Sequence, residues 1–297
     1  MMTLSIDWED FGQLFGKYRH KVISEPVNGA IERQTDVILD LLDETGNKAT
    51  FFILGMLARH RPQLVKKIAS RGHEVGVHGQ NHESMYSLSR ASARKDLECA
   101  YKTITDIVGA KVYGYRAPFF SINKTNLYML EILADMGFTY DSSIFPMKLP
   151  RYGIDDFNEE AALYKLANGK EIVELPLTVS TWLGRKWPVS GGGYIRLMPE
   201  FLVNRVFDGL HKKNMDGMLY IHPYEIDPEP IDVSANYIKG THFSKLNVRA
   251  QNLRWNIFRG SVYFKIKRLL ARFKFTTCLE RATYVKGKTD GSSLLGQ

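Results

Sequence analysis

Cysteine is scarce in this chain: only Cys99 and Cys278 occur among 297 residues. Neither has a His or Cys neighbour at metal-ligand spacing, and two thiols provide no disulfide framework, so we expect buried free thiols in a reducing compartment. A run of about 18 apolar residues is also absent, so no membrane-spanning helix is predicted. The N-terminus enters a strand at once, at Thr3–Ile6, without a basic segment and an apolar core. We therefore expect no secretory signal and a cytoplasmic location.

Acidic residues are scarce in one long segment near the C-terminus. Between Lys245 and Lys288 the chain has twelve Lys or Arg but only one acid, Glu280. Apolar residues interleave with the bases from Phe258 to Phe273, which predicts a basic amphipathic helix. Such a helix either packs on the preceding domain with a solvated basic face or makes peripheral contact with the inner membrane surface. The segment has no base-reading motif, so we expect no nucleic-acid partner.

Short apolar strands alternate with amphipathic helices over residues 3–221. Continuous apolar strands joined by crossover helices predict a parallel sheet covered by helices. No Gly-rich dinucleotide-binding turn follows any of these strands. About seven such units therefore favour an α/β fold of the closed or nearly closed (β/α) barrel type over a doubly wound sheet.

Polar side chains gather where the predicted strands end. They are Asp7, Glu9, Asp10, His78, His82, Arg116, Asp141 and His222. The carboxyl ends of all strands meet on one face of a β/α barrel, so we expect these residues at one rim. His78 and His82 lie four residues apart and can face one point from a single turn of backbone. The pair alone is a weak signal, and its position after a strand strengthens it.

These residue types suit a metal-dependent hydrolase. A carboxylate from Asp7–Asp10, together with the two histidines, is a ligand set for zinc, cobalt or nickel. A second carboxylate could take a proton from water, and Arg116 could hold that base ionised. The backbone N–H after Pro118 could bind an oxyanion, and His222 could protonate a departing amine.

Five short segments carry these residues in chain order. They are Ser5–Asp10, His78–His82, Arg116–Ser121, Tyr140–Ser143 and Leu219–Pro223. In this order they resemble the signature segments of the NodB-type polysaccharide deacetylases, a class of carbohydrate esterases. Two more phrases, Gly191–Arg196 and His222–Pro228, are similar to the subgroup found with exopolysaccharide and exosortase gene clusters. The likeness runs from about residue 3 to 230, and five ordered segments make it specific.

The resemblance implies a distorted, partly open (β/α) barrel of the polysaccharide deacetylase type. It places the deacetylase catalytic domain at residues 1–243. We expect residues 244–297 to form a basic helical extension that packs on the barrel and has a flexible end.

The resemblance also implies roles for individual residues. Asp7 matches the base, which Arg116 holds. The backbone N–H of Phe119 matches the oxyanion donor, and His222 matches the acid that protonates the leaving amine. His78 and His82 match the two metal-binding histidines.

The carboxylate ligand of the metal is left open. In the family it usually follows the base directly, whereas Trp8 intervenes here. Glu9 is at the position used by members with one inserted residue. Asp10 has the shorter side chain of the usual ligand, and we lean weakly to Asp10.

Substrate contacts are predicted at five positions. They are Pro118, Asp141, Trp182, Tyr194 and Arg196. Aromatic faces and an arginine suit pyranose rings and their substituents. Core aromatics and a surface arginine are the ordinary alternative for the last three.

The predicted function is a metal-dependent amide hydrolase that removes acetyl groups from an N-acetylated amino-sugar polysaccharide or glycan precursor. Zinc is the expected cofactor, with cobalt and nickel as alternatives. Two other functions stay open: a hydrolase of the same barrel that acts on a small cyclic amide or imide, and a catalytically inactive glycan-binding module. The oligomeric state is also open.

Overall fold

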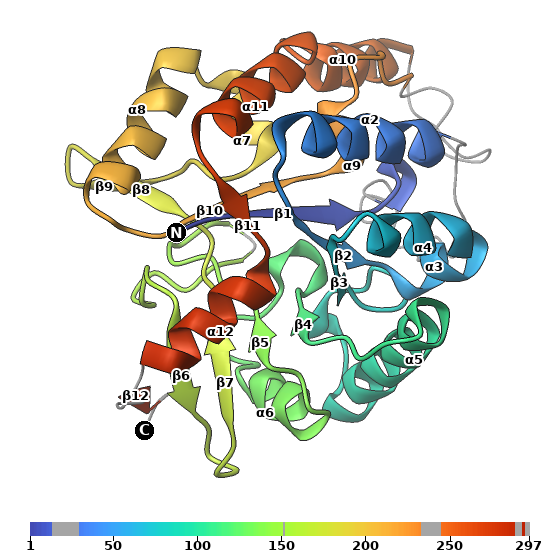
Figure 1. Ribbon diagram of the computed structural model, residues 1–297, viewed down its shortest axis with the longest axis vertical. Helices are drawn as coiled ribbons and strands as arrows, with labels where there is room; N and C mark the ends of the chain where they lie inside the picture. The colour runs from blue at the N-terminus through green and yellow to red at the C-terminus, as the bar shows by residue number, and fades with distance from the viewer. Residues whose placement is uncertain (14–29, 151, 233–244, 289–292, 295–297) are drawn as a thin grey trace.

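The computed structural model describes residues 1–13, 30–150, 152–232, 245–288 and 293–294. One curled sheet lies at its centre, with strand order β10-β1-β2-β3-β4-β5-β7-β6-β12 and with β11 beside β1 (Figure 1). The strands are β1 (Met2–Trp8), β2 (Thr50–Ile53), β3 (Glu74–Val77), β4 (Gly114–Tyr115), β5 (Tyr140–Asp141), β6 (Ala162–Lys165), β7 (Glu171–Glu174), β10 (Gly217–Ile221), β11 (Phe275–Thr276) and β12 (Ser293–Leu294).

The sheet is parallel from β10 to β7 and turns antiparallel at β6. Among the described strands, none joins β10 to the far edge of the sheet, so the sheet curls without closing. The predicted partly open (β/α) barrel is therefore confirmed. Parallel strands leave all their carboxyl ends on one side, and this side carries the polar side chains.

Helices cover the outside of the curled sheet (Figure 1). They are α2 (Ala30–Thr45), α3 (Gly55–His60), α4 (Pro62–Ser70), α5 (Arg90–Val108), α6 (Tyr128–Asp135), α7 (Gly192–Leu197), α8 (Glu200–Lys212), α9 (Pro223–Ile226), α10 (Lys245–Asn256), α11 (Gly260–Arg272) and α12 (Cys278–Lys288). α5 has clear end signals: the Ser89 side chain accepts a hydrogen bond from the Ser92 N–H, and Gly109 ends the helix at φ 71°. None of the described helices has the length and apolar character that crossing a bilayer requires.

The basic C-terminal segment packs on the barrel in two places. α11 buries Val262, Ile266 and Leu269 and lies against α2, α7 and α9. α12 lies against β1, β6 and β7. The short strand β11 ends at Thr276, because the Glu280 carboxylate accepts from the Thr277 N–H and α12 begins directly after it. Most of the predicted flexible end, at 289–292 and 295–297, lies outside the described residues.

A small hairpin projects beside the barrel. It consists of β8 (Val179–Trp182) and β9 (Arg185–Pro188), which pair with each other and not with the main sheet. The two free thiols differ in environment. Cys278 is buried as expected, whereas Cys99 is exposed because it lies on the outward face of α5.

Candidate active site

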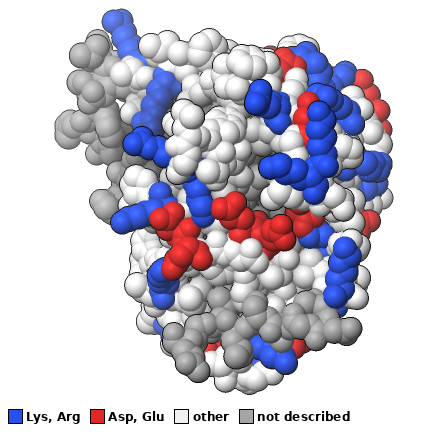
Figure 2. Space-filling view, turned by 90° about the vertical axis from the view of Figure 1, so that its left-hand side faces the viewer, with Lys and Arg blue, Asp and Glu red and all other residues white. Residues whose placement is uncertain are grey.

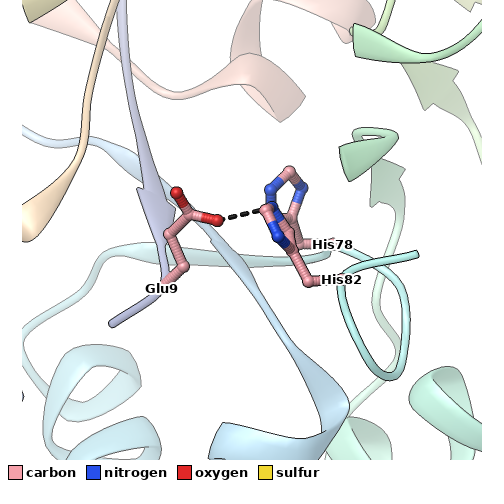
Figure 3. Close-up of side chains that lie close together, drawn as sticks. All are labelled: Glu9, His78 and His82. Carbon is pink, nitrogen blue, oxygen red and sulfur yellow. Dashed lines mark ion pairs between the residues drawn. The ribbon is translucent and has the colours of Figure 1, made fainter. Parts of the chain in front are cut away.

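Three of the predicted metal ligands meet at the carboxyl ends of β1 and β3. One ligand atom from each of Glu9, His78 and His82 lies within 4.8 Å of the other two, and all three side chains are buried. Figure 3 shows Glu9 facing the two imidazoles, with Oε2 2.5 Å from Nε2 of His82. A carboxylate and two imidazoles at this separation form a ligand set for a divalent transition metal.

The strand period explains why Glu9, and not Asp10, reaches this point. Trp8 points outward, where its indole N–H donates a hydrogen bond of 2.9 Å to Thr35 on α2. Side chains two residues apart lie on the same side of an extended strand, so Asp7 and Glu9 both point inward. Asp10 is not in the three-residue group. Its Oδ1 accepts a hydrogen bond from the Gly12 N–H at 2.8 Å, which corrects our lean to Asp10.

The loop after β3 folds back so that both histidines face inward. Gly79 and His82 adopt left-handed backbone conformations, with φ 80° and 58°, and this conformation is costly for His82. The Gln80 N–H donates to the Asp96 carboxylate at 2.9 Å, and the Gly79 carbonyl accepts from the Gly55 N–H at 2.9 Å. These contacts hold the strained loop in place.

The tautomer of His78 follows from its hydrogen bond. Nδ1 lies 2.8 Å from the Arg116 carbonyl oxygen, which can only accept, so Nδ1 carries the proton. Nε2 of His78 then has a free lone pair for a metal. A carbonyl partner behind a ligating imidazole is the usual arrangement of a metal site.

Arg116 ties Asp7 to the wall of the barrel. Its guanidinium is fully buried, and Nη1 lies 2.7 Å from Asp7 Oδ1 and donates to Ser5 Oγ at the same distance. Nε and Nη2 donate to the carbonyl and the hydroxyl of Ser142, at 2.9 and 2.8 Å. These four hydrogen bonds fix the rigid guanidinium, and the one to Asp7 holds Oδ1 and leaves Oδ2 toward the cavity.

His222 approaches the acidic residues from β10. Its Nε2 lies 3.4 Å from Glu9 Oε1 and 3.9 Å from Asp7 Oδ2. On the other side of the ring, Nδ1 contacts Glu225 Oε2 at 3.0 Å, and Glu225 also accepts from the His222 backbone N–H. The Tyr224 ring stacks on the imidazole at 5.0 Å. These contacts point Nε2 into the site.

The protonation states of the site follow from burial and charge. Burial would raise the pKa of Glu9, but the positive charge and hydrogen bond of His82, with smaller effects of His222 and His78, lower it to about 2. Burial lowers the pKa of His78 to about 4. Burial would also lower the pKa of His222, but Glu225, Glu9 and Asp7 together raise it to about 9. At neutral pH the site thus holds an anionic Glu9, a neutral His78 and a protonated His222.

One buried atom supports a metal at this place. Oε2 of Glu9 is fully buried and faces Nε2 of His82, and no other donor in the described part of the chain reaches it. A buried carboxylate needs a nearby cation, and an ion held between Glu9, His78 and His82 would balance its charge. The residues present therefore fit a divalent metal ion.

The site opens into a cavity of about 300 Å³. Its lining includes the predicted residues Asp7, Glu9, His78, His82, Phe119, Tyr194, Arg196 and His222. Phe119 has a left-handed backbone, φ 58°, and its ring lies 4.2 Å from that of His82.

Three of the predicted substrate contacts do not line the cavity. Asp141 is fully buried behind it and accepts hydrogen bonds from the backbone N–H and hydroxyl of Ser143. Trp182 lies on the separate hairpin, where its ring faces Trp187 at 6.4 Å. Pro118 packs under the histidine loop, close to Gly79. Burial and position in the fold thus keep all three side chains out of the cavity wall.

Two family models divide the chain between them. Residues 24–140 match the model described as "Polysaccharide deacetylase", and residues 142–282 match the model described as "Domain of unknown function (DUF3473)".

Residues 24–140 therefore carry a polysaccharide deacetylase domain. Among curated relatives of this chain, "Peptidoglycan deacetylase-like protein FGM2" of Gibberella zeae is 26% identical over 190 residues, which are 61% of this chain and 52% of FGM2. "Chitooligosaccharide deacetylase" of Sinorhizobium fredii is 34% identical over 86 residues, 29% of this chain and 40% of that protein. The matched part thus spans about half or less of these relatives.

Solved structures support the fold of this chain. The "putative polysaccharide deacetylase from Mycobacterium smegmatis" superposes with a TM-score of 0.65 at 20% identity, over 100% of this chain and 93% of that one. "Puue Allantoinase" gives a TM-score of 0.61 at 14% identity, over 98% and 91%. At these identities the likeness establishes the architecture alone.

Sequence reasoning missed several residues of the candidate site. They are Tyr152, Tyr224, Glu225, Arg254 and Trp255, all in the cavity wall. Glu225 had a sequence signal, since it lies three residues after His222 and Pro223 starts a helical turn between them. Trp255 had none, because it reaches the cavity from α10 through a tertiary contact in which its carbonyl accepts from Arg196 at 2.7 Å.

Proposed function

We propose that this protein is a divalent-metal-dependent N-deacetylase of an N-acetylated amino-sugar polysaccharide or glycan precursor. The observation that carries the proposal is the meeting of Glu9, His78 and His82 in one cavity with Asp7 and His222. Such a cavity brings together metal ligands, a base and an acid, which amide hydrolysis requires.

Asp7 is the proposed base. Arg116 fixes one of its oxygens, which leaves Oδ2 to accept a proton from the attacking water. The Phe119 backbone N–H, at the left-handed turn beside His82, is the proposed donor to the oxyanion that forms on the acetyl carbonyl.

His222 is the proposed acid. Glu225 holds Nδ1 and raises the pKa to about 9, so the imidazole carries a proton on Nε2 at neutral pH. Nε2 faces Asp7 and Glu9 across the cavity and can protonate the amine as the C–N bond breaks.

Glu9, His78 and His82 would hold the metal ion, and zinc suits this ligand set best, with cobalt or nickel as alternatives. When bound, such an ion polarises the acetyl carbonyl and makes water more acidic. The carbonyl partner of His78 keeps that imidazole in the tautomer that a metal needs.

The outer part of the cavity suits a sugar chain. Tyr152 and Tyr194 contact each other through their hydroxyls at 3.2 Å, and Arg196 lies over the Trp255 ring at 5.7 Å. Sugars have apolar ring faces and polar hydroxyl groups. Aromatic side chains with polar groups nearby are typical of sites that bind and orient such ligands. Residues 142–282 match a model without assigned function. Because Gly191–Arg196 and His222–Pro228 resemble the exopolysaccharide-associated subgroup, we propose an exopolysaccharide as the natural polymer.

Acetate release tests the proposal. Zinc-loaded protein should release acetate from oligomers of N-acetylglucosamine, and removal of the metal with a chelator should abolish the release until zinc is restored. A parallel panel of cyclic ureides and imides covers the other hydrolase function. Turnover of a ureide by metal-free protein, with no acetate release, would overturn the proposal. Binding of the oligomers without any acetate release would instead indicate an inactive glycan-binding module.

A further inference from the structure

Six large apolar side chains are exposed where α7, α8, α10 and α11 come together. We call them the apolar rim; they are Leu197, Phe201, Leu253, Ile257, Phe258 and Phe264. Phe201, Leu253 and Phe258 are more than 60% exposed, at 68%, 68% and 62%. Large side chains of this kind are usually covered in a soluble protein, so a group of six indicates a contact surface.

Hydrogen bonds join the elements that carry the apolar rim. The Lys265 ammonium on α11 donates to the Ile195, Arg196 and Met198 carbonyls at the end of α7. Arg268 on α11 pairs with Glu200 at the start of α8, at 2.6 Å. α11 is therefore tied to α7 and α8, and the Arg196 side chain of α7 donates to the Trp255 carbonyl of α10 at 2.7 Å.

The apolar rim is continuous with the catalytic cavity. Leu197 belongs to both, and Arg254 and Trp255 line the cavity from the α10 segment that carries Leu253 and Ile257. Phe258 projects at the corner between α10 and α11 in a left-handed conformation, φ 56°. This backbone conformation is disfavoured for an aromatic residue and is characteristic of functional positions.

Positive charge surrounds the apolar rim. α10 and α11 contain eight Lys or Arg and no acid between residues 245 and 272. Arg205 lies one turn after Phe201, and Arg205, Arg249 and Arg254 are exposed with no acidic partner among the described residues. Figure 2 shows Lys and Arg on either side of a largely uncharged area in the upper part of one face, above a central band of Asp and Glu.

We propose that the apolar rim docks on an anionic lipid bilayer. Exposed aromatic and aliphatic side chains flanked by arginines match the boundary between acyl chains and acidic headgroups. Because the apolar rim continues into the cavity, docking would place the cavity mouth at the membrane surface. There it would meet a glycan carried on or near the membrane; this second step rests on the proposed function, whereas the docking itself does not.

Sedimentation with vesicles tests the docking. The full-length protein is mixed with vesicles of phosphatidylcholine containing phosphatidylglycerol, or of phosphatidylcholine alone, at low and high salt. The first variant is Phe201→Ser/Phe258→Ser, and the second is Arg205→Glu/Arg249→Glu. The matched control is Tyr113→Ser/Leu183→Ser, which removes two exposed apolar side chains outside the apolar rim.

We expect the vesicle-bound fraction of wild type to depend on phosphatidylglycerol and to fall at high salt. Either rim variant should weaken partitioning by roughly tenfold or more, because apolar insertion and headgroup attraction both contribute. The control variant should bind like wild type. All variants should release acetate from soluble oligosaccharides at the wild-type rate, so a lack of acetate release contradicts the proposed function and leaves the docking result valid.

Three results would overturn the docking. The first is equal sedimentation of wild type and both rim variants. The second is no sedimentation of wild type with vesicles that contain phosphatidylglycerol. The third is a wild-type protein that does not bind vesicles but forms a dimer in light scattering, which the Phe201→Ser/Phe258→Ser variant loses. This result would assign the surface to a second copy of the chain.

Discussion

Two pairs of buried carboxylates lie at the ends of strands in this barrel, and they behave in opposite ways. Asp7 and Glu9 follow β1, while Asp141 and Glu174 lie opposite each other at the ends of β5 and β7. All four side chains are at most 2% exposed. Burial is therefore equal for the two pairs, and their neighbours must explain the difference.

The β1 pair is surrounded by basic side chains. Arg116 contacts Asp7, while His82 and His222 contact Glu9, and the pKa of Glu9 falls to about 2 in spite of its burial. Glu9 is therefore held ionised, and both side chains face the cavity, as the proposed base and metal ligand must.

Among the described residues, no basic side chain forms an ion pair with the β5–β7 pair. Burial raises the pKa of Asp141, and burial together with the nearby charge of Asp141 raises the pKa of Glu174 well above its usual value. Oε2 of Glu174 meets no donor in the described part of the chain, which is consistent with a proton shared between the two carboxyls. Burial alone thus does not decide whether a carboxylate is ionised. The side chains around the carboxylate decide it.

Among the variants of the β1 pair, Asp7→Asn should cause the largest loss of kcat. Asparagine keeps an oxygen for the Arg116 guanidinium but cannot accept a proton, so kcat for acetate release should fall by about 10²–10⁴-fold. Steady-state acetate assays measure the loss, and unfolding curves establish that the fold is kept. A kcat within threefold of wild type would remove Asp7 from the role of base.

Arg116→Met tests the cation that separates the two pairs. It leaves Asp7 buried without its guanidinium and removes the bonds to Ser142, so the free energy of unfolding should fall by about 3–5 kcal/mol. Urea denaturation measures the change. Arg116→Lys keeps the charge but loses the fork, and it should lose less; equal stability of the methionine variant and wild type would contradict the argument.

The zinc affinities of Glu9→Gln and Asp10→Asn show which of the two carboxylates binds the metal. Loss of the charged oxygen in Glu9→Gln should weaken zinc affinity by at least about tenfold. Asp10→Asn keeps the oxygen that accepts from the Gly12 N–H and should bind zinc like wild type. Competition with a chromogenic chelator measures both affinities, and the reverse ranking would return the ligand role to Asp10.

Glu174→Gln should have the smallest effect on acetate release, because Glu174 does not line the cavity. Its effect on the free energy of unfolding depends on pH. The folded state keeps a proton on Glu174 that the unfolded state releases above pH 4.5, so wild type loses stability as pH rises from about 4.5 toward the raised pKa. Glutamine has no proton to lose and can still accept from the Ile144 N–H and donate to Asp141. The variant should therefore gain on wild type by up to about 1.4 kcal/mol per pH unit across this range.

Urea denaturation between pH 5 and 8 measures this gain. Glu171→Gln is the matched control, since Glu171 lies on the same strand but is exposed. A stability difference between Glu174→Gln and wild type that stays constant with pH would show that the pair carries no shared proton.

The sequence by itself determined the barrel and the rim of the site. Continuous apolar strands separated by helices require a parallel sheet, and a parallel sheet puts the ends of β1, β3 and β10 on one side. His78, His82 and His222 follow directly from this rule. The choice of Glu9 was also within reach of the sequence, because the two-residue period of a strand puts Asp7 and Glu9 on one face once Trp8 points outward.

Only the tertiary structure decided which of the remaining polar residues face the cavity. Asp141 ends a strand as Asp7 does, but the register of β5 against β7 places it beside Glu174 and away from the cavity. Trp182 fits a sugar site by type, but its strand pairs in the separate hairpin, while Trp255 reaches the cavity from a helix far along the chain. Local pattern sets which side of an element a residue faces. What lies on that side depends on contacts between segments far apart in sequence, and these exist only in the folded chain.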